Sequence, residues 1–252
     1  MLIRLAVSFF SRLGYDLVKK GHDNSVADIK EDHVFMEIYE LCKNFTMTSI
    51  ERLYSLYQAV NYIVDHKISG DFVECGVWKG GSSMMIALTL SKRNDVSRSL
   101  FLYDTFEGMS EPTEMDKTFR GEYANELLRK QSKEDSNSVW CFASLKEVQH
   151  NMRSTAYPPD KVKFIVGKVE DTLNNTAPEK IALLRLDTDW YESTRKELEV
   201  LYPKLNEKGG VLIVDDFGHW QGAKKAVQEY FQASKPLLHR IDNTGRILVK
   251  NT

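Results

Sequence analysis

Five short, nearly continuous apolar runs occur between residues 71 and 217, and helical patterns separate them. Such runs are typical of strands in a parallel sheet whose two faces are both covered by helices. Three segments are predicted helices, namely SSMMIALTLSKR, YESTRKELEVLYPKL and GAKKAVQEYFQAS. We therefore predict an α/β fold with a doubly wound sheet. Its strands are DFVECGV (71–77), SLFLYDT (99–105), KVKFIVG (161–167), KIALLRLDTD (180–189) and GVLIVDDF (210–217).

The segments on either side of this region add a hairpin and a helix. Near the C-terminus, LLHRIDNTGRILVKN has two strand-like runs around Asp-Asn-Thr-Gly, which favours a tight turn. We therefore expect about seven strands, mostly parallel, with an antiparallel pair at the C-terminus. Before the first strand, apolar residues recur at helical spacing over residues 48–66, and Thr48 or Ser49 can cap this helix.

The overall composition excludes several classes of protein. The 252 residues include 34 basic and 36 acidic ones, so the chain lacks the basic surface that nucleic-acid binding requires. Its three cysteines, Cys42, Cys75 and Cys141, form no C-x-x-C pair, which argues against a zinc site and favours a cytoplasmic location. The N-terminal run MLIRLAVSFFSRLGYDLVKK is short and interrupted by arginines. We interpret it as an amphipathic helix that contacts a membrane peripherally at most.

One charged stretch, residues 108–138, interrupts the alternation of strands and helices. It is either a solvated insertion or a lid over the carboxyl ends of the strands. Its position directly after the second strand favours the lid.

A glycine loop follows the first strand, where doubly wound folds bind a nucleotide or nucleoside. FVECGVWKGGSS carries Gly76, Gly80 and Gly81 at a spacing that differs from the dinucleotide motif. Glu74 precedes the turn, and its carboxylate would repel a pyrophosphate but attract an amino group. Asp104 ends the next strand, where an acid typically binds a ribose diol. These features favour S-adenosylmethionine, a nucleoside that carries an amino acid and no phosphate.

Four carboxylates end two later strands. Asp187 and Asp189 end the fourth strand, and Asp215 and Asp216 end the fifth. Because neighbouring parallel strands bring their carboxyl ends together, at least three of these acids can converge on one point. Oxygen ligands select a hard cation, so Mg²⁺ is expected first, with Mn²⁺ or Ca²⁺ possible. The alternative is that each Asp only caps the helix that follows it.

Four blocks in the same order resemble the macrocin O-methyltransferase (TylF/NovP-type) family. They are DFVECGVWKGGSS, LYDTFEGM, LRLDTDWYEST and IVDDFGHWQGAKKAV, within a similarity from about residue 46 to residue 231. The resemblance implies a Rossmann-like class I methyltransferase fold that methylates sugar hydroxyls with S-adenosylmethionine and a metal. The domain would span residues 46–252, with a lid-like insertion at about 108–138 and a helical extension at 1–45.

The resemblance also implies roles for particular residues. Asp187, Asp215 and Asp216 would bind Mg²⁺, and residues 46–52 would close over the cofactor. The predicted cofactor site comprises Glu74, Gly76, Gly80, Gly81, Ser82, Asp104, Thr105, Phe106, Ser144, Glu170 and Asp171.

We expect a sugar hydroxyl to be deprotonated and methylated at this site. Asp187 or His219 can serve as the base, and the histidine has the more suitable intrinsic pKa. Trp190, Tyr191 and Trp220 can stack on a sugar or pack at the rim. The expected partner is a sugar-containing small molecule, and the chain is expected to form a homodimer. The alternatives are a catechol-like diol as acceptor, and a scaffold that binds S-adenosylmethionine without catalysis.

Overall fold

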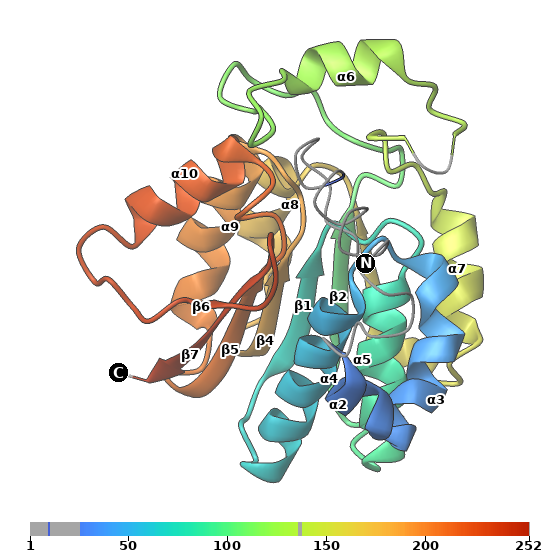
Figure 1. Ribbon diagram of the computed structural model, residues 1–252. Coiled ribbons are helices and arrows are strands. Elements are labelled where there is room, and N and C mark those ends of the chain that lie inside the picture. Colours follow the sequence, from blue (N-terminus) through green and yellow to red (C-terminus); the bar gives the residue numbers. More distant parts are fainter. Residues whose placement is uncertain (1–9, 11–25, 136–137, 252) are drawn as a thin grey trace, which may run out of the picture.

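A seven-stranded sheet forms the middle of the molecule, which we describe from a computed structural model for residue 10 and residues 26–135 and 138–251 (Figure 1). The strand order is β3-β2-β1-β4-β5-β7-β6. The first five strands pair in parallel, whereas β7 pairs antiparallel with β5 and with β6. The strands are β1 (Asp71–Cys75), β2 (Leu100–Asp104), β3 (Val162–Val166), β4 (Ile181–Leu186), β5 (Lys208–Val214), β6 (His239–Arg240) and β7 (Arg246–Asn251). The predicted sheet, including its C-terminal hairpin, is confirmed.

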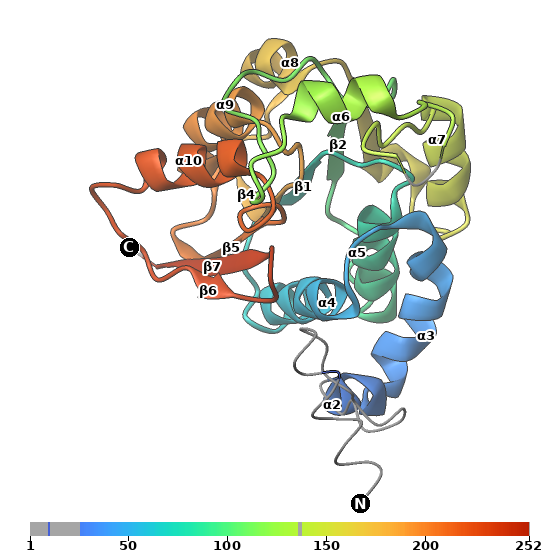
Figure 2. The same ribbon diagram turned by 45° about the horizontal axis from the view of Figure 1, so that its top comes forward.

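Helices cover both faces of the sheet (Figure 2). One face carries α3 (His33–Cys42), α4 (Ile50–Asp65), α5 (Gly81–Lys92) and α7 (Leu145–Arg153). The other carries α8 (Val169–Thr176), α9 (Tyr191–Leu201) and α10 (Gln221–Tyr230). Short helices complete the chain at α2 (Ala27–Glu31), η1 (Lys43–Phe45), η2 (Pro159–Lys161) and η3 (Tyr202–Lys204).

The apolar runs in the strands follow from this two-sided burial. In β5, Val211 and Ile213 join the hydrophobic cluster under α4 and α5, whereas Leu212 and Val214 join the cluster under α9 and α10. All four side chains are almost fully buried. Because neighbouring strand residues point to opposite faces, a strand covered on both sides has few positions for polar side chains.

The helices before β1 pack into the same core as the sheet. Phe35 and Ile38 of α3 are buried in the cluster that also contains Phe72 of β1. Of the two predicted caps for α4, Ser49 is the one observed, since its hydroxyl accepts the backbone N–H of Arg52 at 3.2 Å. The predicted amphipathic helix at residues 1–20 lies outside the described residues except for Phe10. Within the part of the chain that the structure describes, no helix is long and apolar enough to cross a membrane.

The insertion at 108–138 lies over the carboxyl ends of the strands, where Figure 1 shows α6 (Ala124–Lys130) above the sheet. Several hydrogen bonds attach it to the rim, three of which are the following. The N–H of Phe119 donates to the carbonyl of His219 at 2.8 Å, and Gln221 donates its N–H to the carbonyl of Lys117 at 2.8 Å. The buried Asp116 accepts the N–H of Tyr191, also at 2.8 Å. The insertion therefore forms a fixed wall of the cavity below it.

Candidate active site

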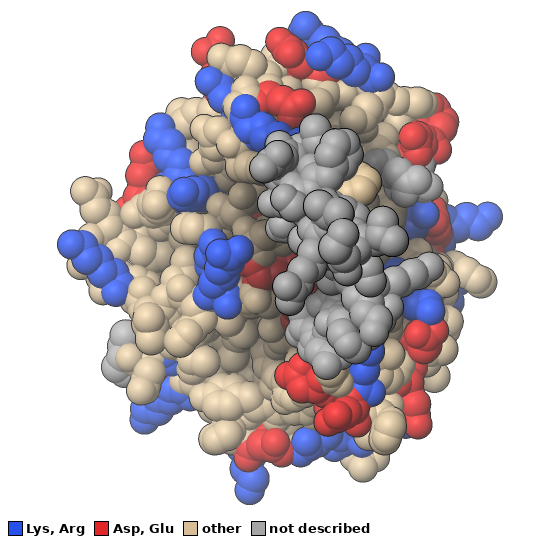
Figure 3. Space-filling view, viewed as in Figure 1, with Lys and Arg blue, Asp and Glu red and all other residues tan. Residues whose placement is uncertain are grey.

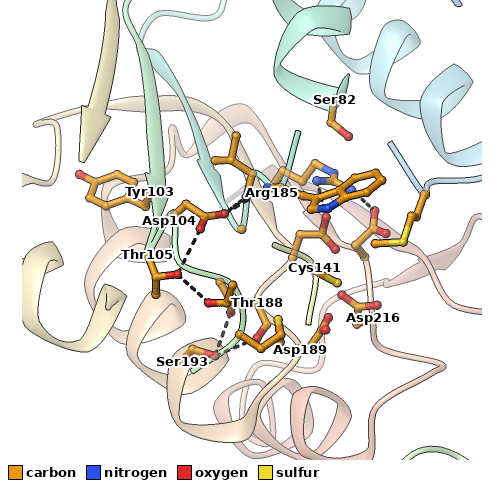
Figure 4. Close-up of a pocket in the computed structure, with 18 of the residues that line it drawn as sticks. Ser82, Tyr103, Asp104, Thr105, Cys141, Arg185, Thr188, Asp189, Ser193 and Asp216 are labelled. Atoms are coloured by element: carbon orange, nitrogen blue, oxygen red, sulfur yellow. Dashed lines mark hydrogen bonds and ion pairs between the residues drawn. The ribbon is translucent and has the colours of Figure 1, made fainter. Parts of the chain in front are cut away.

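A cavity of about 360 Å³ opens at the carboxyl ends of β1, β2, β4 and β5, beneath the insertion. Its size is typical of a small-molecule site. Ten predicted site residues line it, and Figure 4 shows several of them around the cavity. They are Gly76, Gly81, Ser82, Asp104, Thr105, Glu170, Asp187, Asp215, Asp216 and His219. Five others lie outside the lining, namely Glu74, Gly80, Phe106, Ser144 and Asp171.

Three carboxylates meet at the floor of this cavity. Asp187, Asp215 and Asp216 each have an oxygen within 4.8 Å of the others. Asp187 follows β4, and the pair 215–216 follows β5, which is hydrogen-bonded to β4. The predicted convergence of the two strand ends is therefore what the structure shows. In Figure 3, acidic side chains are visible in the hollow at the centre of this face.

Two arginines neutralise part of this acidic cluster. Arg185 of β4 is 2% exposed and contacts three carboxylates: Glu74 at 2.5 Å, and Asp187 and Asp215 at 2.7 Å each. Arg52 of α4 pairs with the other oxygen of Asp215. The surrounding acids raise the pKa of Arg185 although burial alone would lower it, so its guanidinium stays charged.

The negative charge nevertheless exceeds the positive charge at this floor. Burial raises the pKa of Asp187 well above its usual value, and Arg185 only partly opposes the rise. Burial and the adjacent Asp189 raise the pKa of Asp216 in the same way. Burial also raises the pKa of Asp189 to about 7. Without a further cation, some of these carboxyl groups therefore keep a proton near neutral pH.

The residues present fit a divalent metal ion. Among the described residues, Asp216 Oδ2 is buried and has no hydrogen-bond partner. Both oxygens of Asp215 accept from arginines, but each carboxylate oxygen has a second lone pair that can bind a cation. An all-carboxylate set suits Mg²⁺ or another hard ion.

The glycines of the loop after β1 are required by close packing. Gly76 has φ +81°, and a Cβ on it would lie 1.9 Å from the carbonyl oxygen of Asp187. A Cβ on Gly81 would lie 2.6 Å from the carbonyl oxygen of Phe45, so this glycine lets residues 45–46 pack against the start of α5. Both glycines also line the cavity, whereas Gly80 forms the N-cap of α5 with φ +91°.

Asp104 holds the glycine loop in place. One of its oxygens accepts the N–H groups of Val77 and Trp78, at 2.7 and 3.1 Å, and the other accepts that of Phe106 at 2.7 Å. The hydroxyl oxygen of Thr105 also lies 3.5 Å from Oδ1 of Asp104, but this hydroxyl donates at 2.6 Å to the carbonyl of Gly108, so the carboxylate has room for one more donor. Asp104 can therefore fix the loop and still accept a hydroxyl from a ligand in the cavity.

Each of the predicted residues outside the cavity lining has another observed environment. Glu74 is 2% exposed and pairs with Arg185 and Ser83, so it lies beneath the floor. Ser144 caps α7 by accepting the N–H of Glu147. Phe106 packs edge-on against Phe164 in the core. Asp171 is exposed in the first turn of α8. Direct cofactor contacts of these residues stay predictions.

The predicted aromatic residues divide between the cavity and the rim. Trp190 and Trp220 are both buried and pack edge to face, with ring centroids 4.8 Å apart. Trp220 lines the cavity, whereas the indole N–H of Trp190 donates to the carbonyl of Ser110 in the insertion. Tyr191 donates its hydroxyl hydrogen to Glu229 on α10. Of these three residues, Trp220 is therefore the one that lines the cavity.

His219 lies on the loop between β5 and α10, three residues after Asp216 in the sequence. It is half-buried and lines the cavity together with the three carboxylates. Burial lowers the pKa of His219, and the positive charge of Arg52 lowers it further. The imidazole is therefore neutral at pH 7 and can accept a proton.

Some residues of the site are not evident from the sequence. Arg185 carried a signal, since it is a charged residue inside an apolar strand two positions before Asp187. Its partner Glu74 lies directly opposite on β1. Arg52 belongs to the segment 46–52 that was expected to close over the cofactor, but its pairing with Asp215, 163 positions away, carried no signal in the sequence. Trp78, whose buried indole N–H has no partner among the described residues, is a further cavity residue.

The strand order and the cavity at the carboxyl ends of the strands are those of the class I O-methyltransferases. The solved O-methyltransferase NovP is 33% identical, with a TM-score of 0.70, over 82% of this chain and 83% of NovP. The O-methyltransferase from Bacillus cereus in complex with SAH has the same fold, with 14% identity and a TM-score of 0.54.

Comparison of sequences gives the family. The family Macrocin-O-methyltransferase (TylF) matches residues 25–250. A tetracenomycin-C 4'-O-methyltransferase of Streptomyces olivaceus, whose named substrate carries a dimethoxy-rhamnosyl group, is 34% identical over 79% of this chain and 73% of its own. Demethyldecarbamoylnovobiocin O-methyltransferase of Streptomyces niveus is 35% identical over 73% of this chain and 67% of its own. The chain belongs to the macrocin O-methyltransferase family, and it is an enzyme of that family.

Proposed function

We propose that this enzyme methylates a hydroxyl group of a sugar, with a divalent metal ion held by Asp187, Asp215 and Asp216. The observation that carries the proposal is the acidic floor of the cavity. There three carboxylates lie within 4.8 Å of one another, and Asp216 Oδ2 is buried without a partner among the described residues. When bound, the metal would supply a Lewis acid that lowers the pKa of the acceptor hydroxyl.

Arg185 and Arg52 would hold the metal-binding carboxylates in place. Together they contact both oxygens of Asp215, and Arg185 also contacts Asp187. This arrangement fixes the carboxylates before a ligand arrives, and a site fixed in advance does not have to be ordered during the reaction.

The cofactor would bind beside this floor along the glycine loop. The first turn of α5, which begins at Gly81, offers backbone N–H groups to a carboxylate. The free lone pair of Asp104 is placed to accept a ribose hydroxyl. S-Adenosylmethionine would supply the methyl group. The contacts described above support one binding position for its carboxylate, at the start of α5, and one for its ribose, at Asp104.

We infer that His219 is the residue that accepts the proton of the acceptor hydroxyl. Its imidazole is neutral. The ring lines the same cavity as the carboxylates, but it lies at the rim of the cavity and the carboxylates lie at its floor. Asp187 is the less suitable base because its carboxylate already contacts Arg185. A metal ion bound at Asp187 would add a second cation beside Arg185, and two cationic partners make a carboxylate a weaker proton acceptor.

The names of the relatives favour a sugar acceptor. The Streptomyces olivaceus enzyme is named for a rhamnosyl-tetracenomycin, and a relative from Micromonospora griseorubida, 30% identical, is named mycinamicin III 3''-O-methyltransferase. We extend this preference to the present chain. Homodimer formation and peripheral membrane contact stay predictions.

A methyl-transfer assay tests the proposal. We expect label from methyl-labelled S-adenosylmethionine to appear on a rhamnosyl acceptor in the presence of Mg²⁺ and to be absent after EDTA treatment. Methyl α-L-rhamnoside, dTDP-rhamnose and caffeate are suitable acceptors for comparison. Preferential labelling of caffeate would contradict the sugar assignment, and labelling that is insensitive to EDTA would contradict the metal assignment.

A further inference from the structure

A second cavity, of about 490 Å³, lies next to the active site on the outer side of the loop between β5 and α10. His219 and Trp220 line both cavities. We call the second cavity the lysine groove, because Lys117, Lys224 and Lys225 line it with a single acidic residue, Glu114. No role has been given to it so far.

Two of the three lysines have no acidic partner. Lys225 lies 3.8 Å from Glu229 on the same helix. Lys117 and Lys224 form no ion pair with any described residue, and their ammonium groups instead lie over the rings of Tyr123 and Phe217. The groove therefore contains two ammonium groups that a ligand anion can reach without displacing a protein carboxylate.

The lining of the groove also includes aromatic residues. Phe119 of the insertion is 59% exposed, and its ring contacts that of His219 with centroids 5.9 Å apart. Phe217 and Trp220 line the groove from the loop after β5. Flat apolar surfaces of this kind bind the face of a sugar or an aromatic ring. The groove thus combines a surface for a ring with cations for an acid.

The groove is placed to receive the far end of a molecule that reacts in the active site. The loop that carries Asp215 and Asp216 continues directly into the residues of the groove, from Phe217 to Gln221. A sugar whose hydroxyl lies at the carboxylates of the active site would therefore place a substituent on its other side in the lysine groove. Only His219 and Trp220 are common to both.

We propose that the acceptor carries a negatively charged group beyond the sugar that is methylated, and that Lys117 and Lys224 of the lysine groove bind this group. The inference rests on the proposed function for the position of the sugar. The charged group is a phosphate, as in a nucleotide sugar, or a carboxylate on the sugar or its substituent. Both present anionic oxygens to ammonium groups.

Binding measured without catalysis tests the groove. The enzyme is saturated with S-adenosylhomocysteine in EDTA, which blocks the cofactor site and removes metal. It is then titrated by calorimetry with dTDP, as a diphosphate, and with D-glucuronate, as a carboxylate. The variant Lys117→Met/Lys224→Met keeps most of the side-chain bulk and removes the two unpaired charges. The control Lys146→Met/Lys163→Met removes two exposed lysines on α7 and β3 that line neither cavity.

We expect at least one anion to bind the wild type, with an affinity that decreases as salt is added. The groove variant should weaken binding at least about tenfold, which corresponds to one charged hydrogen bond, while the control changes it less than about twofold. Binding of dTDP alone assigns the group to a phosphate, and binding of glucuronate alone assigns it to a carboxylate. The proposal is overturned if neither anion binds, or if the control weakens binding as much as the groove variant.

The same titration separates this inference from the proposed function. Asp216→Asn removes a proposed metal ligand but lies outside the groove, so it should leave anion binding unchanged in EDTA. If the anion binds through the lysines but no sugar is methylated, the proposed function is wrong and the proposal of anion binding in the lysine groove is supported. If sugars are methylated but no anion binds, the groove fails and the proposed function stands.

Discussion

The fully buried Arg185 is the link between the two strands that carry the acidic floor. It lies opposite Glu74 on β1 and contacts carboxylates that follow β4 and β5. A buried guanidinium with three acidic partners cannot be removed without leaving several buried charges uncompensated. The side chain thus sets both the stability and the shape of the site.

Replacing Arg185 with methionine is expected to lower the free energy of unfolding by about 3–5 kcal/mol, because it leaves buried carboxylates without their cation. Urea denaturation followed by circular dichroism measures the change. Arg195→Met on the exposed face of α9 is the matched control, since its ion pairs lie at the surface, and it should cost less than about 1 kcal/mol. Equal losses for the two variants would contradict this account of Arg185.

The pH dependence of kcat/KM tests the assignment of His219. Burial and Arg52 lower the pKa of His219 below 6.5, and the neutral ring is the active form. At saturating Mg²⁺, kcat/KM should therefore rise with pH to a plateau, with a midpoint below 6.5. His219→Asn should remove this rise and lower kcat by about 10²- to 10⁴-fold. If the variant keeps the rising limb and most of its activity, Asp187 is the better assignment for the base.

Part of the site is predictable at the scale of residues. The convergence of Asp187, Asp215 and Asp216 follows from the alternation of side chains and the parallel order of the strands. The positions of the arginines do not, because Arg52 reaches the floor from a helix far away in the sequence. Glu74 lies on the predicted strand, but its side chain contacts Arg185 rather than the cavity. The sequence pattern therefore predicts where a strand ends, but it does not predict which residue a given side chain will contact.

At the scale of elements, the insertion at 108–138 is held to the rim by a few defined contacts. Asp116 accepts the N–H of Tyr191 and also the N–H and hydroxyl of Thr113. Gly222 of α10 makes this approach possible, because a Cβ there would lie 2.0 Å from Asp116 Oδ1. The start of α10 therefore determines where the insertion sits over the cavity.

Gly222→Ala should loosen the insertion without closing the cofactor site. Overpacking of this kind costs about 1–3 kcal/mol, so amide exchange in residues 108–131 should become about tenfold faster or more. Hydrogen exchange detected by mass spectrometry measures this rate, and the affinity for S-adenosylhomocysteine should not change. Gln232→Ala, after the end of α10, is the control. Unchanged exchange in the insertion would show that Asp116 does not anchor it.

The strands and main helices were predictable because their signals are local. Four strands of the parallel sheet lie within their predicted apolar runs, and β5 begins two residues before its run, at Lys208. The C-terminal hairpin forms around Asp-Asn-Thr-Gly as expected. The position of the insertion over the strand ends does not follow from a local signal. It depends on contacts of residues 116–119 with loops that lie about 75 to 100 positions later in the chain.

At the scale of the whole molecule, the net charge is only -2, but acidic and basic side chains are concentrated in different places. Acids gather at the floor of the active site, whereas the neighbouring groove holds two lysines, Lys117 and Lys224, that form no ion pair with the described residues. This separation suits an acceptor that presents a hydroxyl to a metal and an anionic group to the groove. The electrostatic design is therefore a property of the assembled fold rather than of the composition.

Proton and metal should compete at the acidic floor. Burial raises the pKa of Asp187 and of Asp216, so both carboxylates bind protons more readily than isolated aspartates do. A metal must displace these protons, and its affinity should therefore decrease as the pH falls. Calorimetric titration of Mg²⁺ at several pH values measures this trend, and an affinity independent of pH would contradict the shifted pKa values.

The most direct test of the central claim is a titration of the enzyme, loaded with S-adenosylhomocysteine, with Mn²⁺ followed by electron paramagnetic resonance. The account predicts one Mn²⁺ site per chain, displaced by Mg²⁺. Asp216→Asn should weaken it at least about tenfold, whereas the exposed control Asp171→Asn should leave it unchanged. No stoichiometric site, or equal affinity in the wild type and Asp216→Asn, would contradict a metal centre at Asp187, Asp215 and Asp216.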